Sequence, residues 1–432
     1  MILLFYICFF YFLQKYLVLF LKISIFAVFL LNYSKILSLF TLNGNKMMEK
    51  KVMGYVCDTN PFEDRLTWSG LIYKIREAIE SAGYQVVWIP YDKSIASVRF
   101  WERIRWRLFK VLGGKQILGG CHFLPETYAL AKSIAKNKQF DNCDFLFFPG
   151  GGQISLFIKT KKPIIYYTDA TVHLMIDYYW FNYHPLSIKM ACWLEKRACH
   201  KALLNIRASS WATNSVIKDC NCKPSKCVTL EFGANIDSSD ISPITPYKSG
   251  QLRALFSGVE WDRKGGDIAV DTIKILRDKG FDAVLHVVGI KELPKYCRNC
   301  SFIVNHGFLD KNDSASYAKY IDILRKGHIM LLPTQAECAG IVFCEAASFG
   351  IPSYTYATGG TENYVINGIN GYTISPTRGA SDFADLISND IKLGNFDKLH
   401  DGALNLYKEK LSWSAWSRRF REVINSISVC DR

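Results

Sequence analysis

The stretch LLPTQAECAGIVFCEAASFGIPSYTYATGG, residues 331–360, decides the fold. Its first residues belong to the apolar run Ile329 to Leu332, which is typical of a buried parallel strand, and a small-residue loop carrying Glu337 follows. A helix is predicted from Gly340 to Gly350, and Ser353 to Tyr356 is predicted to be the next strand. The stretch therefore predicts one strand–loop–helix–strand unit of a doubly wound α/β sheet.

The start of this helix is a predicted anion site. In an open α/β sheet a ligand lies outside the carboxyl ends of the strands, where helices present unpaired N–H groups that favour phosphate. Glu337 lies in the loop at this mouth and Glu345 lies inside the helix, so two carboxylates can accept hydroxyl donors on both sides of a diphosphate. That combination suits a nucleotide sugar. The amides come from residues 338–342, among them Gly340, Ile341 and Val342.

Glu337 and Glu345, in the order AECAGIVFCEAASFGIPSYTYATGG, resemble the Glu-x7-Glu signature of glycosyltransferase family 4. The resemblance extends from about Met53 to the C-terminus. It implies a GT-B architecture, in which two Rossmann-like domains face each other across a cleft, and transfer of a hexosyl group with retention. It also implies that Glu337 contacts the transferred sugar and Glu345 the nucleotide ribose. The other interpretation, a solvated helix face, does not explain the small-residue loop and the flanking strands.

By this resemblance the donor is a UDP- or GDP-sugar and the acceptor a glycan or lipid-linked molecule. Assembly of a cell-envelope polysaccharide is expected by analogy alone. A nucleotide-sugar epimerase of the same fold, or a non-catalytic two-lobed ligand-binding protein, are the alternatives. A dinucleotide oxidoreductase is disfavoured because no G-x-G-x-x-G follows either opening strand.

Four segments are predicted along the 432 residues. Residues 1–46 are a hydrophobic segment, 47–243 an acceptor domain, 244–412 a donor domain, and 413–432 a helix that crosses back to the first domain. The stretch 237–250, rich in Ser and Pro, is the predicted interdomain linker.

The N-terminal segment has two interpretations. Lys15 and Lys22 interrupt its apolar residues, so no uninterrupted span of about 20 residues could cross a membrane. The two lysines would share one helical face, which suits a helix lying on an anionic membrane. Alternatively, Met47 or Met48 is the native start. We expect a cytoplasmic protein, associated with the inner face of the membrane if this segment is retained.

Two residues near the end of a core strand are candidate catalytic residues. The predicted strand 163–167 runs into Asp169 and His173, at or just beyond the carboxyl end where catalytic side chains lie in such sheets. The resemblance implies a histidine facing the sugar, but Asp169 occupies that position. If the chain becomes helical at Ala170, Asp169 and His173 share a face and can pair. Alternatively, the aspartate caps a helix and the histidine is unrelated.

The turn GVEWDRKGG, residues 258–266, is the predicted diphosphate contact. The resemblance implies an arginine and a lysine there. Lys264 matches the lysine, whereas Val259 stands where the arginine is expected, so Arg263 would supply the missing charge to the leaving group. A solvated Arg–Lys pair at a helix start is the alternative.

Four more residues are candidates for donor binding. Gly70 precedes the predicted helix 71–82, and Gly233 follows the last strand of the first half. The resemblance implies that both glycines let backbone approach the donor phosphates. Phe308 and Leu309 follow a later strand, where the resemblance implies stacking of the nucleobase.

The formal charge of +14 favours an anionic partner. The basic and aromatic helix RFWERIRWRLFKVL, residues 99–112, could touch a membrane surface by resemblance to enzymes with lipid-linked acceptors, or could pack an aromatic face into the core. The core interpretation is slightly favoured, and no nucleic-acid partner is expected.

The 14 cysteines are scattered, which suits reduced thiols. Cys297 and Cys300, and the group Cys220, Cys222 and Cys227, have partial metal spacing but lack a second CxxC or a His pair. No paired Asp motif offers a divalent-ion site. We therefore expect no metal and no cofactor.

Overall fold

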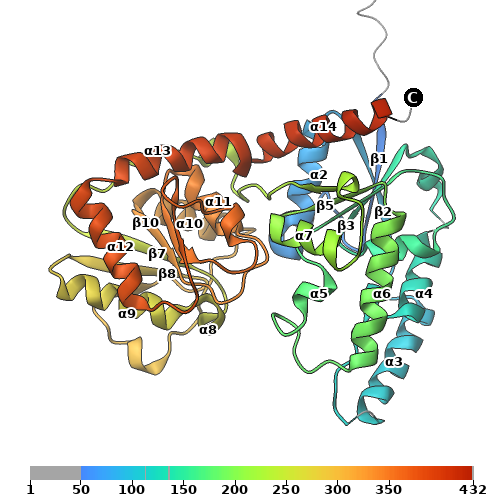
Figure 1. The fold of residues 1–432 in the computed structure, drawn as a ribbon, viewed down its shortest axis with the longest axis horizontal. Coiled ribbons are helices and arrows are strands. Elements are labelled where there is room, and N and C mark those ends of the chain that lie inside the picture. Colours follow the sequence, from blue (N-terminus) through green and yellow to red (C-terminus); the bar gives the residue numbers. More distant parts are fainter. Residues whose placement is uncertain (1–49, 112, 135–136, 431–432) are drawn as a thin grey trace, which may run out of the picture. The chain divides into compact units, whose positions relative to one another are not determined.

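The computed structural model describes residues 50–111, 113–134 and 137–430. Within these ranges the chain builds two six-stranded sheets with helices around them (Figure 1). The strand orders are β2-β1-β3-β4-β5-β6 and β12-β11-β10-β7-β8-β9, and all neighbouring strands are parallel. The predicted fold class, two Rossmann-like doubly wound sheets of GT-B type, is confirmed.

The central strands of the first sheet are more buried than its edge strands β2 and β6. β3 and β4 are buried at every residue, as expected for parallel strands that are covered on both faces. The strands are β1 (Val52–Cys57), β2 (Gln85–Pro90), β3 (Phe145–Pro149), β4 (Ile164–Thr168), β5 (Leu204–Arg207) and β6 (Cys227–Thr229). The helices are α2 (Leu71–Ser81), α3 (Ala96–Val111), α4 (Leu124–Ile134), α5 (Val172–Met175), α6 (Pro185–Lys201) and α7 (Ser210–Lys218).

The second sheet contains the strand–loop–helix–strand unit that the sequence predicts. Its strands are β7 (Leu252–Ser257), β8 (Ala283–Val288), β9 (Ile303–Asn305), β10 (Ile329–Leu332), β11 (Ser353–Tyr356) and β12 (Gly371–Ile374). Its helices are α8 (Trp261–Lys264), α9 (Gly266–Asp278), α10 (Ser314–Lys326), α11 (Ile341–Ser348), α12 (Ala380–Leu393) and α13 (Phe396–Leu406). A π-helical segment, Tyr407–Leu411, precedes the last helix, α14 (Trp413–Cys430).

α14 packs on the first sheet and its helix α2. The indole of Trp416 is fully buried, stacks on Phe420 at 4.7 Å, and donates a hydrogen bond to the Tyr167 hydroxyl at 3.1 Å. The Ser417 hydroxyl donates to the Ala78 carbonyl of α2 at 2.8 Å. The last helix therefore supplies core to the first sheet. Residues 51–432 form one unit by their contacts, so the boundary at 243/244 stays a prediction.

α3 departs from the favoured interpretation of its sequence. Val98 is its only fully buried residue within the described range, while Phe100, Trp106 and Val111 are 50%, 60% and 81% exposed. The aromatic side chains thus do not form a core face, and several of them are exposed. α3 lies beside α4 (Figure 1). The two interpretations of residues 1–46 concern residues outside the described ranges. Among the described helices, none has the length and apolarity needed to cross a membrane.

Candidate functional site

Loops from both sheets line a cavity of about 600 Å³. The loop after β1 supplies Trp68, the end of β4 supplies Asp169, the turn after β7 supplies Lys264, and the loop after β10 supplies Glu337. These loops all follow the carboxyl ends of parallel strands, which is where open α/β sheets bind their ligands. The cavity is therefore the candidate site.

The Lys264 turn lies directly against the loop before α11. Lys264 is 8% exposed and its ammonium forms an ion pair with the Glu337 carboxylate. The Gln335 amide donates to the Arg263 carbonyl at 2.7 Å. Gly265 allows this approach, because its φ is +75° and a Cβ atom there would lie 2.0 Å from the carbonyl oxygen of Pro333. The sequence thus brings a cation to the predicted anion site.

The start of α11 faces the same cavity. Gly340 precedes the helix, and no side chain caps its first amides. Ile341 and Val342 line the cavity, as do the preceding residues Cys338 and Ala339. The first amides of a helix have no partner within the helix and carry a partial positive charge, so this end of α11 favours an anion.

Glu345 is held at the cavity wall from inside α11. Its side chain is fully buried, and its carboxylate accepts hydrogen bonds from the Lys311 ammonium and, at 2.6 Å, from the Tyr320 hydroxyl. A carboxylate has about four acceptor positions, so two contacts leave it able to accept further hydroxyl donors. Both partners also line the cavity, and neither was predicted from the sequence.

The other predicted donor residues divide into two groups. Phe308 and Leu309 line the cavity, and Phe308 is 51% exposed. Gly70 does not line it, although its neighbours do, and its φ of +82° belongs to a left-handed turn. Gly233 lies elsewhere, because a Cβ atom there would meet the backbone and ring of Trp413 at 2.7 to 2.8 Å. Its lack of a side chain admits α14 rather than a phosphate.

The loop after β1 is strained at the cavity. Trp68, Ser69 and Gly70 have φ values of 52°, 57° and 82°, so two residues with side chains adopt the left-handed conformation. The Asn235 side-chain amide donates to the Ser69 carbonyl at 2.6 Å. The conformation places the Trp68 indole N–H 3.2 Å from Oδ2 of Asp169, to which it donates. The strained turn thus aims a donor at the candidate catalytic carboxylate.

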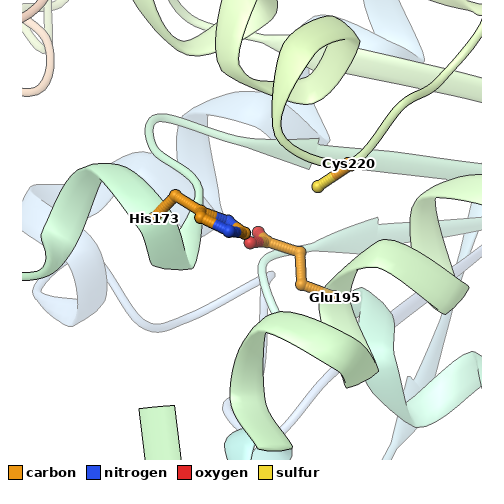
Figure 2. A group of neighbouring side chains, drawn as sticks. All are labelled: His173, Glu195 and Cys220. Carbon is orange, nitrogen blue, oxygen red and sulfur yellow. The ribbon is translucent and has the colours of Figure 1, made fainter. Parts of the chain in front are cut away.

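Asp169 lines the cavity, whereas His173 does not. Burial raises the pKa of the Asp169 carboxyl, while hydrogen bonds from Trp68 and Thr168 lower it. The expected pairing of Asp169 with His173 is wrong. α5 begins at Val172 with Thr171 as its N-cap, not at Ala170, and the exposed His173 lies beside Glu195 on α6 instead (Figure 2).

Two tyrosines that the sequence analysis missed connect this site across the cavity. Tyr178 accepts a hydrogen bond from the Glu337 amide at 2.8 Å, and Tyr179 donates to the Ala336 carbonyl at 3.1 Å. The Arg263 guanidinium donates to the Tyr179 hydroxyl at 3.0 Å and pairs with Glu260 at 2.9 Å. Arg263 is therefore bonded rather than solvated. The aromatic run YYWFNY after β4 contains both tyrosines and is the sequence feature that could have indicated them.

Comparisons with known proteins agree with this geometry. Residues 237–399 match the family described as glycosyl transferases group 1. The chain is 24% identical to sucrose synthase 2 of Hordeum vulgare over 243 residues, which cover 44% of this chain and 30% of that protein. The chain thus spans less than a third of the length of that relative.

Solved structures resemble nearly the whole chain. A glycosyltransferase from Rickettsia africae has a TM-score of 0.62 at 16% identity and covers 88% of this chain and 99% of its own. HepE of Anabaena, solved in complex with UDP and glucose, has a TM-score of 0.54 at 14% identity and covers 88% and 100%. The chain therefore has the GT-B fold of these proteins, and its residues 237–399 are similar to the glycosyl transferases group 1 family.

Proposed function

We propose that this protein is a glycosyltransferase of family 4 that moves a hexosyl group, with retention, from a nucleotide-diphosphate sugar to a glycan or lipid-linked acceptor. One observation carries the proposal: the Lys264 ammonium, the Glu337 carboxylate and the uncapped start of α11 meet in one cavity. A cation and helix amides suit a diphosphate, and the carboxylate suits the adjoining sugar.

The proposed leaving group is a nucleoside diphosphate. Lys264 and the α11 amides would stabilise the negative charge that develops on it in the transition state, which is electrostatic catalysis by groups already in place. Arg263 lines the cavity and would add a second cation, although Glu260 shares its charge. With this charge supplied by the chain, no metal is required at the diphosphate.

The remaining contacts define the rest of the donor. Glu337 would orient the sugar and Glu345 would accept hydrogen bonds from the ribose. Phe308 and Leu309 would hold the base against an aromatic and an apolar surface. A UDP- or GDP-sugar fits these contacts. The Anabaena structure, which was solved with UDP and glucose, supports a uridine nucleotide.

Asp169 would face the acceptor oxygen as it attacks. It follows β4 of the first sheet and lines the cavity, whereas Lys264 follows β7 of the second sheet. We assign this role to Asp169 alone, because His173 does not line the cavity.

We also propose that α3 touches the membrane surface that carries a lipid-linked acceptor, on the cytoplasmic side. Trp106 and Val111 are 60% and 81% exposed, and arginines and lysines alternate with the apolar side chains. The purified protein should sediment with anionic vesicles, and less with neutral ones, and Trp106→Ala should reduce this. Equal sedimentation of the variant would remove α3 from the proposal.

The donor is tested first by thermal denaturation with UDP-, GDP- and ADP-sugars, because a ligand of the folded state alone raises the melting temperature. The sugar nucleotide that binds is then incubated with glycan and lipid-linked acceptors, and products are identified by mass spectrometry. A stabilising donor that is transferred supports the proposal. Epimerised donor without an acceptor indicates an epimerase, and binding without turnover indicates a binding protein.

Site variants complete this test. Glu345→Ala should weaken donor binding, and Lys264→Ala should lower turnover. Lys274→Ala is the control, since this exposed lysine of α9 pairs with Asp271 away from the cavity. Full activity in both site variants would refute the assignment of the cavity.

A further inference from the structure

A cluster of three side chains lies outside the cavity. His173 of α5, Glu195 of α6 and Cys220, which follows α7, have ligand atoms that all lie within 4.8 Å of one another (Figure 2). None of the three lines the donor cavity. We propose that they bind one zinc ion, with a water molecule as the fourth ligand. This inference is independent of the proposed transferase activity.

The ligand types favour zinc over other common ions. An imidazole nitrogen, a carboxylate oxygen and a thiolate sulfur are the donors that Zn²⁺ takes in tetrahedral sites, whereas Mg²⁺ and Ca²⁺ prefer oxygen alone. Binding would release the thiol proton of Cys220 to solvent, since the thiolate is the ligand. Three protein ligands with an open fourth position are a known zinc arrangement.

Glu195 is the second, independent observation for a cation here. Its side chain is 1% exposed, and its carboxylate accepts one hydrogen bond, from the Val172 amide at 2.6 Å. It forms no ion pair within 4.0 Å among the described residues. Arg207 is its more distant positive neighbour. A buried carboxylate is costly without a close counter-charge, and an ion between His173 and Cys220 would supply one.

Hydrogen bonds already hold the three ligands' elements together. The Val172 amide, adjacent to His173, binds the Glu195 side chain itself. The hydroxyls of Thr171, the N-cap of α5, and Ser215 of α7 share a hydrogen bond of 2.6 Å. This bond joins the helix of His173 to the helix that precedes Cys220. The His200 ring of α6 lies 2.8 Å from the Cys220 carbonyl. The three ligands are therefore already held close together, and zinc would need only a small contraction and a turn of the exposed His173 ring.

The proposed ion would hold the chain in place just after β4, the strand that precedes Asp169. α5 begins three residues after Asp169, and Met175 at its end lines the donor cavity. A metal that joins α5 to α6 and α7 would hold this segment in place and take no part in the transfer reaction, because none of its three ligands lines the cavity.

The test uses the full chain, purified without a histidine tag and without chelators. Zinc measured by mass spectrometry should be present at a one-to-one ratio. After removal of zinc, added Co²⁺ should give the near-ultraviolet charge-transfer band of a thiolate ligand. His173→Ala should lower zinc affinity at least about tenfold, and Cys220→Ser should abolish the cobalt band.

Two features keep this test decisive. His173 is exposed, so its variant tests the site without disturbing the core. Cys222→Ser is the matched control, because Cys222 is a buried thiol of the same loop that is not in the cluster. A cobalt band that persists in Cys220→Ser, that is lost in Cys222→Ser, or that never forms would overturn the proposal, as would unchanged zinc affinity in His173→Ala.

Discussion

The hydrogen bond from Trp68 to Asp169 should set the acid limb of the pH–rate profile. Trp68→Phe removes the indole N–H and keeps an aromatic ring against Phe232, which Trp68 contacts edge-on at 5.5 Å. The removed bond favours the charged form of Asp169, so its loss raises the carboxyl pKa further above the ordinary value. With a raised pKa, the carboxylate is already protonated at a higher pH when the solution is made more acidic. Activity that needs the carboxylate should therefore be lost at a less acidic pH than in the wild-type protein.

The expected size follows from the geometry of this bond. Hydrogen bonds to charged groups contribute roughly 1.5–3 kcal/mol, and the 3.2 Å distance to Asp169 places this one near the lower end. One pKa unit corresponds to about 1.4 kcal/mol, so the acid limb should move up by about one pH unit. The strained φ of Trp68 is left unchanged by a phenylalanine.

The assay is the initial rate of nucleotide release from the identified donor, measured across the pH range. Trp88→Phe is the matched control, since its indole donates to the Cys57 carbonyl at 3.1 Å in the same sheet, without contact to Asp169. The control should keep the wild-type profile. A Trp68→Phe enzyme that is slower at every pH, with its acid limb unmoved, would refute the role given to this bond.

Three further outcomes are expected. Gly265→Ala should lower the melting temperature more than Gly280→Ala; both have positive φ, which costs about 1–2 kcal/mol for alanine, but only Gly265 also meets a backbone carbonyl. Equal decreases in the melting temperatures of the two variants, measured by calorimetry, would contradict this. Phe308→Ala should weaken nucleotide binding about tenfold by calorimetric titration, because stacking on the base contributes about 1–3 kcal/mol; unchanged affinity would place the base elsewhere. Glu337→Gln should tighten binding of UDP and slow transfer, because it frees Lys264 for phosphate; weaker UDP binding would contradict the pairing.

The β10–α11–β11 unit was predictable because local signals mark each of its boundaries. The apolar run Ile329–Leu332 is too short for a helix, and Gly350 lies just past the end of α11 with a φ of +74°. Lys264 was singled out by the family resemblance of its turn, and the structure places it at the end of the short helix α8, between β7 and α9. The sequence therefore predicts an element well where neighbouring residues determine both its boundaries and its chemistry.

The rest of the site depends on contacts between distant residues. A start of α5 two residues later than expected separates His173 from Asp169, since each residue turns a helix by about 100°. Gly233 meets α14, which comes from the far end of the sequence. The left-handed conformation of Trp68 is held by Asn235 through Ser69, and no local pattern predicts a strained turn for residues that disfavour it.

The charges that line the cavity suit a ligand that carries both a phosphate and a sugar, as the proposed donor does. Although the chain carries +14, the cavity lining is balanced, with Arg65, Arg263, Lys264 and Lys311 against Asp169, Asp310, Glu337 and Glu345. Each of the two glutamates forms an ion pair with a lysine, Glu337 with Lys264 and the fully buried Glu345 with Lys311. A diphosphate that takes Lys264 leaves Glu337 unpaired unless a sugar hydroxyl arrives with it. A free sugar carries no negative charge, so it cannot replace Glu337 as the partner of Lys264. The ion pair therefore favours a ligand that brings phosphate and sugar together, which is the requirement for a donor rather than for its products.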